Sequence, residues 1–185
     1  MTPGHGIWDL FTSSTFLSSS TPIKINFKMA ALRFVKSVLL SFQKESGLEP
    51  RLFGENLRVT AAEPGRVDFE LDIKKEHTNR LDIIHGGAIA SMVDLGGSLA
   101  VASKGLYATG VSTDLNVTYL SSGGRVGDVL KAVVKCDKFG KTLAYTSIQF
   151  TNSKGEIAAR GSHTKYIALA WKHPENAVDQ LSPQK

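Results

Sequence analysis

The sequence predicts an α+β domain in which an antiparallel β-sheet wraps around a central helix. The first indication is Gly86–Lys104, which is apolar or small nearly all round, as expected of a helix enclosed by other structure. The second is a set of segments that alternate apolar and polar residues, the pattern of half-exposed strands. A length of 185 residues suits one domain with an adequate core.

Five segments carry the strand pattern, and two short turns separate the last three of them. Phe139-Gly140-Lys141 and Asn152–Gly155 supply these turns, so the last three segments are predicted to form an antiparallel meander. The predicted strands are Val67–Ile73, Val111–Tyr119, Val129–Cys136, Thr142–Thr151 and Glu156–Ile167.

An amphipathic helix is predicted over Met29–Lys44, where Leu32, Val35, Leu39 and Phe42 recur at helical spacing. Such an apolar stripe either packs onto a sheet or lies on a membrane surface, and packing is the expected role here.

The predicted domain covers residues 29–172, between two ends of different composition. Residues 1–28 are rich in Ser and Thr and poor in acids, so we expect a disordered or organelle-targeting extension. Residues 173–185 contain two prolines and are predicted to be a flexible tail.

Composition excludes several classes of protein. A single cysteine, Cys136, excludes a disulfide scaffold and a Cys-based zinc site, and His and acidic residues do not cluster at metal-ligand spacing. No apolar run is long enough to span a bilayer.

The net charge of +5 is concentrated in residues 123–172, which hold nine Lys/Arg and three Asp/Glu. This bias fits an anionic partner, and the pattern leaves oligonucleotide binding possible but does not favour it.

Candidate catalytic groups gather around the central helix. His85-Gly86-Gly87 stands where a loop enters this helix, whose N-terminal N–H groups can stabilise an oxyanion. Asp94 lies in the apolar helix itself, either as a structural acid or as a general base. Ser112 opens the following strand and could orient a water molecule, or could simply be a strand residue.

Three other polar residues remain open to two interpretations. Asn79 could donate a hydrogen bond to a substrate carbonyl or form a turn. His85 could be a general base or could hold its loop by a hydrogen bond. His163 lies on an alternating segment and is interpreted as structural or near a ligand.

Four motifs in this order resemble the hotdog-fold acyl-CoA thioesterases. They are HTNRLDIIHGGAIASMVDLGGSLA, GVSTDLNVTYLSSGGRVGD, GKTLAYTSIQFTN and GSHTKYI. The similarity extends from about Ala31 to Ile167. It implies a hotdog domain that pairs with a second copy, with the active site between the subunits, and that often assembles further into tetramers.

The resemblance also implies residue roles. Asn79 and the backbone N–H of Gly86 would polarise the thioester carbonyl. Asp94 and Ser112 of the facing subunit would activate and orient the attacking water, and His85 would support the loop. A hydrolysis of this kind needs no metal or cofactor. The basic residues that could contact the phosphates of CoA are Lys138, Lys141, Arg160 and Lys165.

The expected activity is therefore hydrolysis of medium- or long-chain fatty acyl-CoA to free fatty acid and CoA. Two alternatives stay open: an acyl-thioester hydratase or dehydratase with His85 as base, and a non-catalytic acyl-CoA or lipid-binding module. The expected partners are acyl-CoA and further copies of the chain, without nucleic acid and without stable membrane insertion. The expected location is cytoplasmic, mitochondrial or both.

Overall fold

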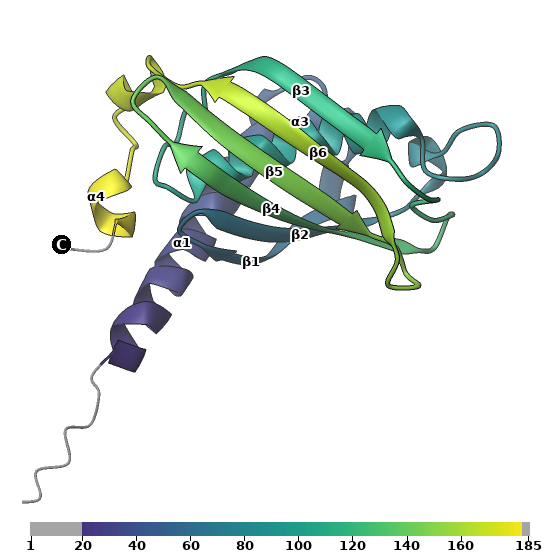
Figure 1. Cartoon of the computed structure of the whole chain (residues 1–185), viewed down its shortest axis with the longest axis horizontal. Coiled ribbons are helices and arrows are strands. Elements are labelled where there is room, and N and C mark those ends of the chain that lie inside the picture. The colour runs from purple at the N-terminus through teal and green to yellow at the C-terminus, as the bar shows by residue number, and fades with distance from the viewer. Residues whose placement is uncertain (1–19, 183–185) are drawn as a thin grey trace, which may run out of the picture.

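Six strands form one antiparallel sheet in the order β1-β2-β4-β5-β6-β3, and helix α3 lies against one of its faces (Figure 1). The computed structural model describes residues 20–182, with side chains from residue 27 onward. This arrangement confirms the predicted antiparallel sheet around a central helix. The elements are α1 (Ser20–Glu45), α2 (Glu49–Leu52), η1 (Gly54–Asn56), β1 (Leu57–Glu63), β2 (Arg66–Asp72), η2 (Lys75–His77), α3 (Gly86–Ala102), β3 (Val111–Tyr119), β4 (Val129–Phe139), β5 (Leu143–Thr151), β6 (Ile157–Tyr166), η3 (Ala170–Lys172) and α4 (Val178–Leu181).

Helix α3 is buried along most of its length, and paired glycines let the sheet approach it closely. A Cβ atom on Gly96 would lie 2.8 Å from Ile148 Cδ1, and one on Gly97 would lie 2.4 Å from His163 Nδ1. Both distances are shorter than van der Waals contact, so any larger residue would push the sheet away. The small residues on α3 therefore allow it to pack closely against the sheet of the same chain.

Helix α1 begins at Ser20, nine residues before the predicted start at Met29, and its N-terminal part projects beyond the sheet (Figure 1). Further along, Ala31, Val35, Val38 and Leu39 are buried in the core that α1 shares with β1 and α3. This confirms packing as the role of the apolar stripe. None of the described helices is long and apolar enough to cross a membrane.

Strand β1 is an element that the sequence pattern does not predict. Its pairing with β2 shifts register between Val59 and Ala61, and this irregularity places Val59 and Ala62 in the interior although they are three residues apart. Because a bulge breaks the two-residue period, the segment does not show strand alternation. Its two alanines and terminal glutamate also have low strand propensity.

The described part of the predicted flexible tail over 173–185 packs against the domain. Asn176 accepts a hydrogen bond from the backbone N–H of Tyr107 at 2.9 Å, and the Ala177 N–H donates to the Gly105 carbonyl at 2.8 Å. Leu181 is buried in the main core. These long-range bonds hold the loop between α3 and β3, and local proline content gives no sign of them. Residues 183–185 and the predicted extension up to residue 19 lie outside the described chain.

Strand β3 is an edge strand with one side unpaired by any described strand. It hydrogen-bonds only to β6 within the described sheet, and nearly all of its residues are exposed. Val111, Leu115 and Tyr119 are among its exposed apolar side chains. An edge strand with free N–H and C=O groups and apolar side chains is a template for pairing with another strand.

Candidate active site

Asp94 is the exposed residue in an otherwise buried stretch of α3, and three polar side chains surround its carboxylate. Ser112 Oγ of β3 lies 3.4 Å from Asp94 Oδ1. From β6, His163 Nε2 and Lys165 Nζ lie 3.6 and 3.8 Å from the same oxygen. His163 Nε2 also lies 2.9 Å from Ser112 Oγ. The structure thus brings the predicted pair Asp94 and Ser112 together and adds two basic residues to it.

The two basic side chains of this cluster lie in the interior, whereas Asp94 does not. His163 and Lys165 are 0% and 2% exposed, and the Asp94 side chain is 52% exposed. Burial lowers the pKa of His163, and the neighbouring Lys165 charge lowers this pKa further. Burial also lowers the pKa of Lys165, against the opposing effect of Asp94. His163 is therefore a neutral imidazole near pH 7.

The N-terminus of α3 presents backbone N–H groups beside a short loop. His85 is its N-cap, and His85 Nδ1 accepts the Gly87 N–H at 2.8 Å. Gly86 is the first helical residue, so its N–H has no acceptor within the helix. The Gly86 carbonyl accepts a hydrogen bond from the Tyr119 hydroxyl at 2.8 Å, which ties this turn to β3.

The cap bond favours the interpretation of His85 as a residue that supports its loop. Because Nδ1 accepts a hydrogen bond, the neutral ring carries its proton on Nε2. Such a ring can donate a hydrogen bond to a ligand but presents no free basic nitrogen. His85 is therefore placed to support the loop.

Asn79 lies at the start of the loop that leads to His85, with its side chain fixed by this loop. Its carboxamide oxygen accepts the Leu81 N–H at 2.9 Å, and its backbone N–H donates to the Ile83 carbonyl at 2.9 Å. Asp82, with φ of 56°, adopts the left-handed conformation that Asp tolerates better than most residues. With the Asn79 carboxamide oxygen occupied, its NH₂ group is the donor that remains for a ligand.

Asn79 and Gly86 both line a pocket of about 430 Å³ at this end of α3. Ile83, Ile84 and Ile89 form part of its apolar wall. A pocket with an apolar wall and two polar donors is suited to an organic ligand that carries one carbonyl group.

The two groups of predicted site residues do not meet within one chain. Gly86 and Asp94 are eight residues apart on α3, which corresponds to about 12 Å along a helix. A carbonyl held at the Gly86 N–H is therefore too far from Asp94 of the same chain for a water molecule to bridge them. The Asn79–Gly86 pocket and the Asp94–Ser112 cluster are therefore two separate groups, called half-sites here because the site implied by the family resemblance needs both.

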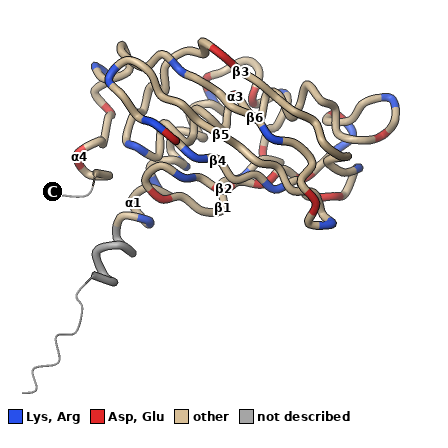
Figure 2. The backbone as a smooth tube through the Cα atoms, viewed as in Figure 1, with Lys and Arg blue, Asp and Glu red and all other residues tan. Residues whose placement is uncertain are grey.

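The four basic residues predicted to contact CoA do not form one patch. Lys138, Lys141 and Arg160 are exposed, whereas Lys165 is buried. Arg160 and Lys165 are five residues apart on β6, about 17 Å in a strand. Figure 2 shows basic residues spread over several strands and loops. The interior position of Lys165 disagrees with a role on a CoA-binding surface.

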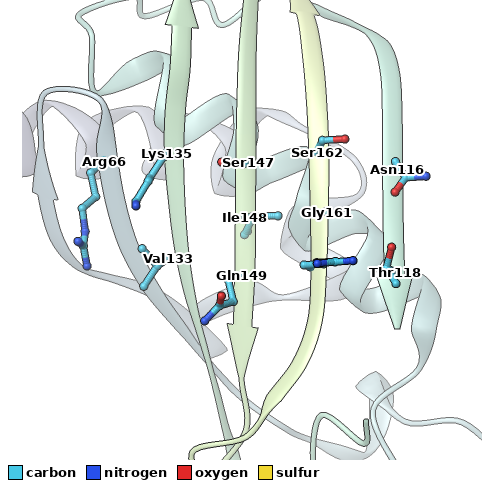
Figure 3. A pocket seen from close by; sticks show the side chains of 11 residues that line it. Arg66, Asn116, Thr118, Val133, Lys135, Ser147, Ile148, Gln149, Gly161 and Ser162 are labelled. Atoms are coloured by element: carbon cyan, nitrogen blue, oxygen red, sulfur yellow. The ribbon is translucent and has the colours of Figure 1, made fainter. Parts of the chain in front are cut away.

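Arg160 instead lines a groove of about 620 Å³ on the outer face of the sheet, opposite α3 (Figure 3). Polar residues of five strands contribute to it, among them Arg66, Lys135 and Gln149. This face lies away from Asp94, which is on the α3 side of the sheet.

Neither a reactive cysteine nor a metal site is found among the described residues. Burial raises the pKa of the Cys136 thiol to about 11, so this cysteine stays protonated and unreactive. Within residues 20–182, no group of three or more His, Cys, Asp or Glu side chains is arranged to hold a metal ion.

Sequence reasoning did not place Lys165 and Tyr119 near the catalytic candidates, and it gave His163 no definite role. The strand alternation does place His163 and Lys165 on one face, two residues apart. The missing information was the pairing of β6 with β3, which sets Lys165 opposite Ser112. Two other strands lie between β3 and β6 in the sequence, so no local signal reveals their pairing.

The fold defines a hotdog-fold protein, and the chain belongs to the thioesterase superfamily. The sequence pattern of that superfamily matches residues 81–159. Human acyl-coenzyme A thioesterase 13 is 37% identical over 134 residues, which is 72% of this chain and 94% of the human protein.

Solved structures of the superfamily share the fold. Thioesterase superfamily member 2 from zebrafish has a TM-score of 0.66 and 32% identity, covering 73% of this chain and 96% of its own. A Streptococcus pneumoniae thioesterase protein solved with coenzyme A has a TM-score of 0.58 and 26% identity, covering 63% of this chain and 88% of its own.

Proposed function

We propose that this protein hydrolyses medium- or long-chain fatty acyl-CoA thioesters to the free fatty acid and CoA. The observation that carries the proposal is the pair of half-sites along α3. One half-site presents the Asn79 amide and Gly86 N–H to a pocket, and the other presents Asp94 beside Ser112. Membership of the superfamily and similarity to acyl-coenzyme A thioesterase 13 support CoA thioesters as the substrate class.

In the proposed reaction, the thioester oxygen accepts hydrogen bonds from the Gly86 N–H and the Asn79 NH₂ group. Asp94 takes a proton from a water molecule, and the water oxygen forms a bond to the carbonyl carbon. The negative charge moves onto the carbonyl oxygen, where the two donors stabilise it. The intermediate then expels the CoA sulfur, which takes the proton from Asp94.

The distance between the half-sites supports a homodimer as the active form. Pairing of β3 with the β3 of a second copy would extend the sheet and satisfy its unpaired edge. Because a two-fold axis relates the two copies, this pairing would also bring Asp94 of each copy toward Gly86 of the other. Further pairing of dimers into a tetramer is part of the proposal, following the family resemblance.

The purified protein should release free CoA thiol from saturated acyl-CoA substrates. A thiol-reactive dye measures the rate across a series of chain lengths, and the proposal expects kcat/KM to be highest for medium or long chains. Tight acyl-CoA binding without thiol release would favour the non-catalytic module. Loss of a double bond from an enoyl-CoA without thiol release would favour the hydratase.

Sharing of the site can be tested by complementation between two inactive variants. In a mixed dimer of Asp94→Asn and Gly86→Pro chains, one of the two sites receives both wild-type residues. Co-expressed chains should therefore recover about one quarter of the wild-type activity if pairing is random. The molar mass of the wild-type protein, measured by light scattering, should be a multiple of the 20.0 kDa chain mass. No recovery in mixed dimers isolated with two affinity tags would place the whole site within one chain.

We also propose that the protein acts in the cytoplasm, the mitochondrion or both. A lone cysteine suits a reducing compartment, and the acid-poor first 28 residues suit organelle import.

A further inference from the structure

The side chain of Tyr119 joins the last residue of β3 to the first residue of α3. Its hydroxyl donates a hydrogen bond to the Gly86 carbonyl at 2.8 Å. Its ring also lies against Gly86, because a Cβ atom added to this glycine would be 3.3 Å from Tyr119 Cζ. Both residues line the pocket of about 430 Å³ at this end of α3. Tyr119 therefore contacts the turn that carries the proposed carbonyl donor.

The peptide group between Gly86 and Gly87 is hydrogen-bonded at both of its ends. Its carbonyl accepts the Tyr119 hydroxyl, and its N–H, which belongs to Gly87, donates to His85 Nδ1 at 2.8 Å. The preceding peptide group is held as well, since the His85 carbonyl accepts the Ala88 N–H at 3.0 Å. A glycine without such bonds has wide conformational freedom. Gly86 lies between two held peptide groups, and this sets the direction of its N–H.

Strand β3 contacts both half-sites, one near each of its ends. Near its start, Ser112 Oγ lies 3.4 Å from Asp94 Oδ1, and its last residue, Tyr119, bonds to Gly86. In the proposed dimer, antiparallel pairing of the two β3 strands would set the start of one beside the end of the other. The bond from Tyr119 then links the carbonyl donor of one copy to the strand that borders Asp94 of the other.

We propose that Tyr119 is a positioning residue for the hydrolysis, whose hydroxyl fixes the Gly86 N–H relative to β3 and thereby to Asp94 of the second copy. This role rests on the proposed function, in which the Gly86 N–H stabilises the oxyanion. A misplaced donor costs most in the transition state, where negative charge develops on the carbonyl oxygen. Tyr119 acts through Gly86, so substrate binding does not depend on its hydroxyl.

Tyr119→Phe should lower kcat for a medium- or long-chain acyl-CoA by about tenfold, the upper range for loss of one neutral hydrogen bond. KM should change by less than about twofold, because phenylalanine keeps the ring that lines the pocket. Tyr145→Phe is the matched control and should keep the wild-type kcat and KM. Tyr145 is an exposed tyrosine of β5, and its hydroxyl has no hydrogen-bond partner within the described chain. A wild-type kcat in Tyr119→Phe, or a raised KM with an unchanged kcat, would contradict the positioning role.

A double-mutant cycle tests whether Tyr119 acts through Gly86. Gly86→Pro lacks the N–H, so adding Tyr119→Phe to it should lower kcat by less than about twofold further. A second tenfold loss would place the effect of the hydroxyl elsewhere and refute the proposal. Dissociation of the Tyr119→Phe dimer, measured by light scattering, would also refute it and would indicate a role in subunit contact.

Amide hydrogen exchange gives a readout that does not depend on enzyme activity. The Gly87 N–H belongs to the peptide group whose carbonyl accepts from Tyr119. It should therefore exchange about five- to tenfold faster in Tyr119→Phe and at the wild-type rate in Tyr145→Phe. If the wild type releases no thiol, the proposed function fails while this exchange rate still tests the contact. Unchanged exchange at Gly87 in Tyr119→Phe would overturn the inference, because the hydroxyl would then not hold this peptide group.

Discussion

Replacement of Asp94 by asparagine should lower kcat for acyl-CoA hydrolysis by about 10²- to 10⁴-fold, the usual contribution of a general base. Asparagine has the same shape but cannot accept a proton from water. The Asp94 side chain is 52% exposed, so the substitution leaves core packing unchanged. Single-turnover rates with a medium- or long-chain acyl-CoA would measure the loss separately from product release.

Asp114→Asn is the matched control for that variant. Asp114 is also an exposed aspartate, two residues from Ser112 on the same strand, but no described contact joins it to the Asp94 cluster. Its kcat should stay close to the wild-type value. A wild-type rate in Asp94→Asn would remove Asp94 from the proposed reaction.

Proline at Gly86 should lower kcat by about 10²- to 10³-fold, the typical cost of losing one oxyanion donor. Proline removes the N–H in question, and the first position of a helix tolerates it well. His85 has φ of −70° and ψ of 136°, the extended conformation that a residue before proline prefers. The helix should therefore form normally in this variant.

Gly86→Ala separates the loss of the N–H from the addition of a side chain. A Cβ at this position would lie 3.3 Å from the Tyr119 ring, and this tight contact is common to alanine and proline. Alanine keeps the N–H and should retain most of the activity. Equal losses in both variants would indicate displacement of Tyr119 and not the loss of a hydrogen-bond donor.

The elements that the sequence predicts well are those with a continuous local pattern, either strand alternation or an unbroken apolar run. The strand Val111–Tyr119 was predicted with the bounds that the structure gives, and α3 begins at the predicted Gly86. Strand β1 was missed because its bulge breaks the alternation. The packing of the C-terminal segment has no local sequence signal, because Asn176 bonds to Tyr107, far away in the sequence.

The candidate site was predictable where residue type alone restricts the chemistry. An aspartate within an apolar helix and glycines at the helix start drew attention to Asp94 and Gly86 before any geometry was known. The position of Lys165 beside Asp94 depends on the pairing of β6 with β3. Without this pairing, a lysine in a basic stretch is expected on the surface, which is where most lysines lie.

The place of β3 beside β6 also constrains the order in which a growing chain can complete its sheet during synthesis. Strands β1, β2, β4 and β5 each find a neighbour soon after they emerge. Strand β3 is made before β4, yet its partner β6 is made last among the six described strands. Until then Ser112 belongs to an unattached segment, and its distance to Asp94 is not defined. The contact between Ser112 and Asp94 therefore forms only after β6 has been made, well after the helix that carries Asp94.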